Sequence, residues 1–226
     1  MLKIAHRGSH STLPENSLSA FKHAISLGAD AIELDVRLCG SGEVIVLHDP
    51  WMKRVFGASG NVRKMSLEEI QNYTFIGTNE CLPTLEDVFH VLGKKIQINV
   101  EIKDINVYNH DLARRVVQLI DVYDLYKTVW ISSFNPLVLD FIKTIEPKIK
   151  TGFLFNKTKY IPLLLSQFLQ FDAWHPNYQL VDEAFMSVAR KREKEVYAWT
   201  VNQQEDIDSL KALNINGIIT DYIERL

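Results

Sequence analysis

Short apolar runs alternate with longer segments of helical periodicity along most of the chain. Each run is a few residues long and is bounded by polar or glycine-containing segments, which is typical of a strand buried in a parallel sheet. Eight of these runs follow one another at intervals and are predicted to be barrel strands: residues 3–6, 31–36, 97–102, 128–132, 150–155, 171–174, 195–201 and 217–220.

The segments between these runs carry apolar residues at every third or fourth position, which predicts amphipathic helices. Continuous alternation of strand and helix indicates a parallel sheet covered by helices. Eight repeats suit an α/β fold of the closed (β/α)8 TIM-barrel type better than an open doubly wound sheet, and no glycine-rich nucleotide-binding motif follows any run. The helices are expected at residues 17–27, 111–123, 135–145, 160–169, 182–192 and 204–213.

One stretch interrupts this rhythm. After the turn signal Gly40-Ser41-Gly42, the apolar run 44–47 is expected to pair back as a hairpin on the second barrel strand. The residues that follow contain predicted helices at 66–73 and 84–92, and they are too numerous for an ordinary connecting loop. We therefore predict a small insertion after the second barrel strand, at about residues 51–95.

Composition narrows the class of protein. The 226 residues suffice for one barrel domain, and 46% hydrophobic with 23% charged residues is ordinary for a soluble globular protein. A net charge of −3 gives no bulk attraction for nucleic acid or acidic membranes. The two cysteines, Cys39 and Cys81, match neither a disulfide framework nor a zinc-binding spacing, so they are expected to be reduced thiols.

The N-terminus shows no signal-peptide features, and the most apolar stretch, residues 161–171, is too short to span a bilayer. We expect a cytoplasmic monomer or homodimer without stable membrane insertion and without a nucleic-acid partner.

Ionisable side chains collect at the ends of the first three predicted barrel strands. Active sites of such barrels lie at the carboxyl ends of the strands. Residues two apart on one strand share a face, so these groups are expected to converge at the barrel mouth. They are His6 and Arg7 at the first strand, Glu33 and Asp35 at the second, Glu101 and Lys103 at the third, and His48 after the hairpin run.

The charges suggest a cation and a phosphate. Three converging carboxylates, Glu33, Asp35 and Glu101, are difficult to bring together without a cation, and oxygen ligands favour Mg²⁺ or Ca²⁺ over zinc. Arg7 and Lys103 beside that ion suit a phosphate group, whose charge is redistributed in the transition state.

The two histidines suit proton transfer, because imidazole titrates near neutral pH. His6 and His48 are therefore expected to share the acid and base roles, one accepting a proton from the attacking oxygen and the other donating one to the leaving alkoxide.

These residues stand in a series of short motifs that spans nearly the whole chain. The motifs are His6-Arg7-Gly8, Pro14-Glu15-Asn16-Ser17, Glu33-Leu34-Asp35-Val36, His48-Asp49-Pro50, Pro83-Thr84-Leu85-Glu86, Asn99-Val100-Glu101-Ile102-Lys103, Ser132-Ser133-Phe134 and Trp199-Thr200-Val201-Asn202. In this order they resemble the glycerophosphodiester phosphodiesterase family. Two departures are visible: Ser17 stands where the family more often has Thr, and the short C-terminus leaves room for at most about one turn of a last helix.

The resemblance implies one barrel domain over residues 1–226, with residues 51–90 as the inserted subdomain of the family. It implies that Trp199 lines the substrate pocket, where its ring packs on the glycerol carbons. It also implies metal ligation by the three carboxylates, acid and base roles for the two histidines, and phosphate contacts from the arginine and the lysine. Asn16 and His175 receive no catalytic role, and four further histidines are interpreted as surface or structural residues: His10, His23, His90 and His110.

The expected reaction is metal-dependent hydrolysis of a glycerophosphodiester to sn-glycerol 3-phosphate and an alcohol. Either the glycerol 2-hydroxyl attacks phosphorus first and water then opens the cyclic phosphate, or water attacks directly. Two alternatives remain open at this point: a lysophospholipase D-like phosphodiesterase of the same superfamily, and a non-catalytic phosphate-binding barrel.

Overall fold

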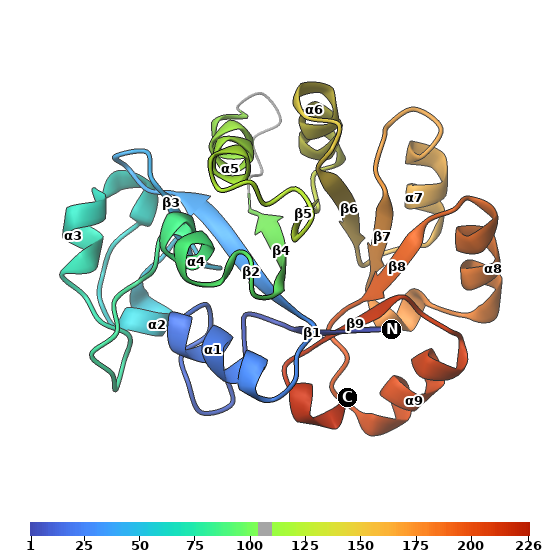
Figure 1. The fold of residues 1–226 in the computed structure, drawn as a ribbon, viewed down its shortest axis with the longest axis horizontal. Coiled ribbons are helices and arrows are strands. Elements are labelled where there is room, and N and C mark those ends of the chain that lie inside the picture. Colours follow the sequence, from blue (N-terminus) through green and yellow to red (C-terminus); the bar gives the residue numbers. More distant parts are fainter. Residues whose placement is uncertain (104–109) are drawn as a thin grey trace.

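A computed structural model describes residues 1–103 and 110–226 and contains a closed barrel. Eight parallel strands form the ring, and β1 pairs with both β2 and β9, which closes it (Figure 1). This confirms the predicted (β/α)8 fold. The barrel strands are β1 (Leu2–Ala5), β2 (Ala31–Leu38), β4 (Gln97–Ile102), β5 (Val129–Ser133), β6 (Lys150–Phe155), β7 (Ala173–Pro176), β8 (Glu195–Ala198) and β9 (Gly217–Thr220).

Helices surround the ring, as the sequence periodicity predicts (Figure 1). Their apolar faces pack on the outer surface of the sheet, where the main hydrophobic core lies. The short 3-10 helix η3 (Ile223–Arg225) follows β9. The helices between the barrel strands are α1 (Leu18–Ser26), α5 (Asp111–Val122), α6 (Pro136–Ile145), α7 (Tyr160–Leu165), η2 (Tyr178–Leu180), α8 (Glu183–Lys191) and α9 (Gln204–Ala212).

The segment after β2 has apolar packing of its own. β3 (Val44–Val46) pairs antiparallel with β2, as the hairpin prediction requires. A second hydrophobic cluster then joins this hairpin to the following segment through side chains that include Met52, Phe56 and Phe75. The single-domain assignment of residues 1–226, with its inserted subdomain, stays a prediction. The helices of this segment are α2 (Lys53–Phe56), η1 (Val62–Lys64), α3 (Leu67–Gln71) and α4 (Leu85–Leu92).

Several predicted limits differ from the structure, and one short helix was not predicted. The predicted strand 195–201 ends at Ala198, and the predicted helix 160–169 ends at Leu165. The predicted strand 171–174 begins two residues before β7. Phe171 is apolar because it is buried in the core outside the barrel, and it is not part of the strand. The four-residue helix α2 carries too little periodicity to be predicted from the sequence.

Gly152 in β6 leaves room for a buried imidazole. A Cβ added at Gly152 would lie 2.2 Å from His175 Nε2, and His175 is fully buried, which lowers its pKa to about 3. We expect Gly152→Ala to destabilise the fold by about 1–3 kcal/mol, because the barrel interior cannot take the extra methyl group without displacing the ring. Urea denaturation measures this effect. In a His175→Ala background the same change should cost clearly less, and equal costs in both backgrounds would refute the steric explanation.

Candidate active site

Three buried carboxylates meet at the mouth of the barrel. The parallel register places Glu33 beside Asn99 and Asp35 beside Glu101 on neighbouring strands β2 and β4. Because alternate residues of a strand share a face, Glu33, Asp35 and Glu101 all point inward. Their oxygens lie within 4.8 Å of one another, and the residues are 2%, 0% and 7% exposed. The structure thus brings together the three carboxylates that the sequence predicts to converge.

Two cations lie against this cluster. Lys103 Nζ is 3.0 Å from Asp35 Oδ1 and 2.5 Å from Glu101 Oε1. Arg7 Nε is 3.2 Å from Asp35 Oδ2, and the Arg7 backbone N–H donates to Glu33 Oε2 at 3.0 Å. Both cations are therefore held on the carboxylates, and both side chains are largely buried.

Burial and mutual repulsion act differently on the three acids. Burial alone would raise the pKa of Asp35, but Lys103 and Arg7 outweigh it and hold that pKa well below its usual range. Burial and the neighbouring carboxylates raise the pKa of Glu33 well above its usual value, and burial above all raises that of Glu101 to about 7. Only at Asp35 do the two cations outweigh the effect of burial on the pKa.

The donor set fits a further hard cation. Glu33 Oε1 is buried and has no hydrogen-bond partner among the described residues. An unpaired buried carboxylate oxygen is costly, and a divalent cation shared with two more carboxylates would satisfy it. Carboxylate oxygens alone favour Mg²⁺ or Ca²⁺ over softer ions.

Each candidate acid or base histidine has an aspartate at the same ring nitrogen. His6, directly after β1, has Nδ1 2.6 Å from Asp221 Oδ1, and His48, after β3, has Nδ1 2.7 Å from Asp49 Oδ1. A carboxylate at Nδ1 fixes the tautomer and leaves Nε2 available for proton exchange. Burial lowers the pKa of His48, although the charge of Asp35 acts in the opposite direction.

Trp199 lies partly buried beyond the end of β8. Its Nε1 donates to the His175 carbonyl oxygen at 2.7 Å, and its ring packs edge-on against Phe134 with centroids 5.4 Å apart. These two contacts fix the orientation of the indole. The neighbouring Phe134 is 43% exposed. Aromatic surface at this position suits the apolar side of a small alcohol.

The structure adds residues to which the sequence interpretation gave no role. Asn16 donates from Nδ2 to Asp35 Oδ2 at 2.9 Å, and its Oδ1 accepts from the Asp35 backbone N–H at 3.2 Å. Glu15 Oε1 accepts from Arg7 Nη1 at 3.0 Å. Both belong to the quoted motif Pro14-Glu15-Asn16-Ser17, so the signal was present in the sequence.

Asp221 and His10 had no comparable signal. Asp221 follows β9, the last strand, and reaches His6 only because β9 and β1 are neighbours in the closed ring. His10 Nε2 lies 3.1 Å from the same oxygen of Asp221, and Asn202 Nδ2 donates to the other oxygen at 2.7 Å. Asp221 is thus oriented by three partners.

Comparison with known proteins shows the family to which this chain belongs. Residues 6–225 match the Glycerophosphoryl diester phosphodiesterase family. A glycerophosphodiester phosphodiesterase of Caldanaerobacter subterraneus subsp. tengcongensis is 34% identical over 234 residues, which cover 100% of this chain and 96% of that protein. The crystal structure of a glycerophosphodiester phosphodiesterase from Thermotoga maritima is similar at 30% identity, with a TM-score of 0.83 over 99% of this chain and 96% of that one.

A phosphodiesterase of Oleispira antarctica, solved in complex with the product sn-glycerol-3-phosphate, shares the fold at 23% identity, with a TM-score of 0.89 over 98% of this chain and 93% of that one. Fold and site together define a phosphodiester hydrolase of the (β/α)8 class. The chain belongs to the glycerophosphoryl diester phosphodiesterase family and is an enzyme of that class, which confirms the resemblance seen in its motifs. The alternative of a non-catalytic barrel is set aside. In the described parts of the chain, no helix is long and apolar enough to cross a membrane.

Proposed function

We propose that the enzyme hydrolyses glycerophosphodiesters to sn-glycerol 3-phosphate and an alcohol, with one divalent cation and two histidines. The observation that carries this proposal is the composition of the mouth: three buried carboxylates, two cations held on them, and two histidines each with an aspartate at Nδ1. No one of these groups is specific, but together they provide for charge neutralisation and for two proton transfers.

The cation would be held by Glu33, Asp35 and Glu101, whose oxygens converge and whose charge the two neighbouring cations do not balance. When bound, Mg²⁺ or Ca²⁺ supplies Lewis-acid stabilisation of charge on the phosphoryl oxygens. Arg7 and Lys103 bind the remaining phosphate charge, and Asp35 orients both of them.

Proton transfer falls to His6 and His48 through their Nε2 atoms. One imidazole takes the proton of the attacking hydroxyl, and the other donates a proton to the leaving alkoxide. The arrangement serves attack by the glycerol 2-hydroxyl, followed by opening of a cyclic phosphate, and equally direct attack by water. Asp221 and Asp49 hold the rings and stabilise the imidazolium that forms at each step.

A coupled assay for sn-glycerol 3-phosphate tests the proposal. Glycerophosphocholine, glycerophosphoethanolamine and glycerophosphoglycerol should all release it in Mg²⁺ or Ca²⁺. Bis(p-nitrophenyl) phosphate should be a much poorer substrate despite its better leaving group, because it offers no glycerol to Trp199. If bis(p-nitrophenyl) phosphate is the best substrate, the glycerol pocket is wrongly assigned.

Trp199→Ala should raise KM for glycerophosphocholine roughly tenfold, because the indole face that packs on the glycerol carbons is lost. KM for bis(p-nitrophenyl) phosphate should change much less. Trp199→Phe keeps an aromatic face and should recover most of the affinity. Equal KM changes for both substrates would assign Trp199 to the barrel core instead.

One observation favours a second candidate, a lysophospholipase D-like activity. Phe134 and Leu137 are 43% and 46% exposed, and Phe134 touches Trp199 beside the mouth. The lysophospholipase D GDPD1 of Rattus norvegicus is 26% identical to this chain, and the match covers 99% of this chain and 84% of that protein. If lysophosphatidylcholine is cleaved faster than glycerophosphocholine, this candidate replaces the first.

A further inference from the structure

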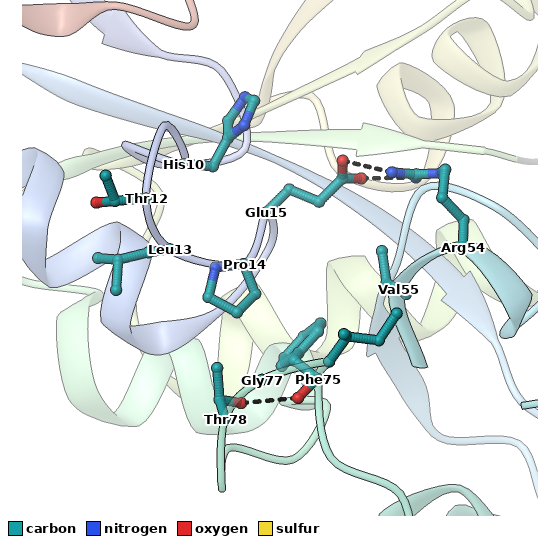
Figure 2. A pocket seen from close by; sticks show the side chains of 11 residues that line it. His10, Thr12, Leu13, Pro14, Glu15, Arg54, Val55, Phe75, Gly77 and Thr78 are labelled. Atoms are coloured by element: carbon teal, nitrogen blue, oxygen red, sulfur yellow. Dashed lines mark hydrogen bonds and ion pairs between the residues drawn. The ribbon is translucent and has the colours of Figure 1, made fainter. Parts of the chain in front are cut away.

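Arg54, on α2 after the hairpin, binds two carboxylates from different parts of the chain. Its Nη1 and Nη2 donate to Glu15 Oε2 and Oε1 at 2.6 and 2.8 Å, and its Nε donates to Asp49 Oδ2 at 2.5 Å. Glu15 lies in the loop between β1 and α1, whereas Asp49 follows β3. Figure 2 shows the paired contact of Glu15 with Arg54.

This contact closes one side of a pocket of about 380 Å³ beside the mouth. One wall is the loop that carries His10 and Leu13, and the other carries Val55 and Phe75 (Figure 2). The β1–α1 loop and the segment after the hairpin therefore meet at one ion pair.

Each of these two carboxylates also contacts a residue of the candidate site. Asp49 uses its other oxygen, Oδ1, on His48 Nδ1 at 2.7 Å. Glu15 Oε1 also accepts from Arg7 Nη1 at 3.0 Å, and Arg7 in turn lies on a metal-site carboxylate. One guanidinium is thus connected to a candidate acid or base on one side and to a phosphate-binding cation on the other.

The chemistry of the three residues matches a positioning role. A guanidinium presents several N–H donors in a rigid plane, so it can hold two carboxylates at fixed directions, which a lysine cannot do. Hydrogen bonds from Arg54 hold the pKa of Glu15 and of Asp49 below their usual values, against the opposite effect of burial. Because 46% of the Arg54 side chain is exposed, these ion pairs are expected to add little to overall stability.

We propose that Arg54 is a positioning residue that orients His48 through Asp49 and Arg7 through Glu15. The segment inserted after the hairpin thereby fixes the geometry of proton transfer and of phosphate binding at the same time. This inference rests on the proposed function, since it takes His48 and Arg7 to act on the phosphodiester.

The test compares single variants on two separate readouts. Asp49→Ala should lower kcat for glycerophosphocholine by roughly 10–100-fold and leave the inhibition constant of inorganic phosphate within about twofold, because His48 is misplaced while Arg7 is not. Glu15→Gln should raise the phosphate inhibition constant on the order of tenfold. Arg54→Ala should show both effects with a melting temperature lowered by only about 3 °C. The control Lys53→Ala, an exposed cation of the same helix, should show neither effect.

Double variants separate this role from a general structural one. Arg54→Ala should lower kcat no further in the Asp49→Ala background, and it should raise the phosphate constant no further in the Glu15→Gln background. Arg54→Lys should recover at most one of the two readouts, since one ammonium group cannot hold both carboxylates in place.

The proposal is overturned if Arg54→Ala keeps both readouts within about twofold of wild type, or if the losses in the double variants simply add. Failure of the proposed function looks different, because the wild-type enzyme would then cleave no glycerophosphodiester. In that case the His48 imidazole proton signal in NMR and calorimetry with inorganic phosphate still decide the role of Arg54. The His48 signal and the phosphate affinity should both change in Arg54→Ala. If neither changes, the positioning role of Arg54 is refuted.

Discussion

His6→Ala and His48→Ala should each lower kcat by ~10² to 10⁴ while the protein stays folded. Each ring is held at Nδ1 by an aspartate, which leaves Nε2 available for the proton transfer that the substitution removes. Steady-state kinetics with glycerophosphocholine measures the loss, and KM should change far less than kcat because neither imidazole is the main phosphate contact.

The control for this experiment is His90→Ala. His90 is exposed on α4, away from the mouth, and its replacement should leave kcat unchanged. Circular dichroism checks that each variant is folded. If either His6→Ala or His48→Ala keeps more than about half of the wild-type kcat, that residue is neither a general acid nor a general base.

Removal of divalent cations should abolish activity to below about one thousandth of the starting rate, because the cation contributes several kcal/mol of charge stabilisation at the phosphoryl group. Mg²⁺ or Ca²⁺ should restore the rate. The ion should also raise the melting temperature, since it binds the folded carboxylate cluster and not the unfolded chain. Asp35→Asn should remove both effects, because Asp35 is the acid that stays ionised most readily in the cluster.

Elemental analysis of the stripped protein provides the control for the metal experiment. Full activity in a sample shown to contain no divalent cation would eliminate the metal role of Glu33, Asp35 and Glu101. The three carboxylates would then have to be explained by their ion pairs with Arg7 and Lys103 alone.

The barrel could be predicted from the sequence because each βα repeat is a local pattern. A buried parallel strand is apolar on both faces and a covering helix is apolar on one, so the two periods alternate visibly along the chain. Where an apolar residue serves another purpose the prediction shifts, as at Phe171, which packs outside the sheet before β7 begins. Where an element has only one turn, as α2 does, no period can be seen.

The carboxylates and cations of the candidate site could be predicted for a related reason. Glu33 and Asp35 lie two apart on β2, and Glu101 on β4 lies two before Lys103, which directly follows that strand, so strand periodicity brings them to one mouth. Their roles in metal and phosphate binding stay predictions until the experiments above are done.

The contacts that orient these residues could not be predicted in the same way. Asp221 reaches His6 across 215 positions of sequence because the first and last strands are neighbours. Arg54 reaches Glu15 across 39 positions because the segment after the hairpin folds back on the β1–α1 loop. Such contacts depend on closure of the barrel and on the packing of irregular segments. Neither of these produces a periodic pattern in the sequence.

Phosphorus NMR of glycerophosphocholine incubated with the enzyme and Mg²⁺ or Ca²⁺ tests the central claim most directly. The account predicts that the diester signal is replaced by that of sn-glycerol 3-phosphate, with free choline in equal amount, and that nothing changes in chelator. Persistence of the diester in every metal, or the appearance of phosphocholine in place of sn-glycerol 3-phosphate, would contradict it.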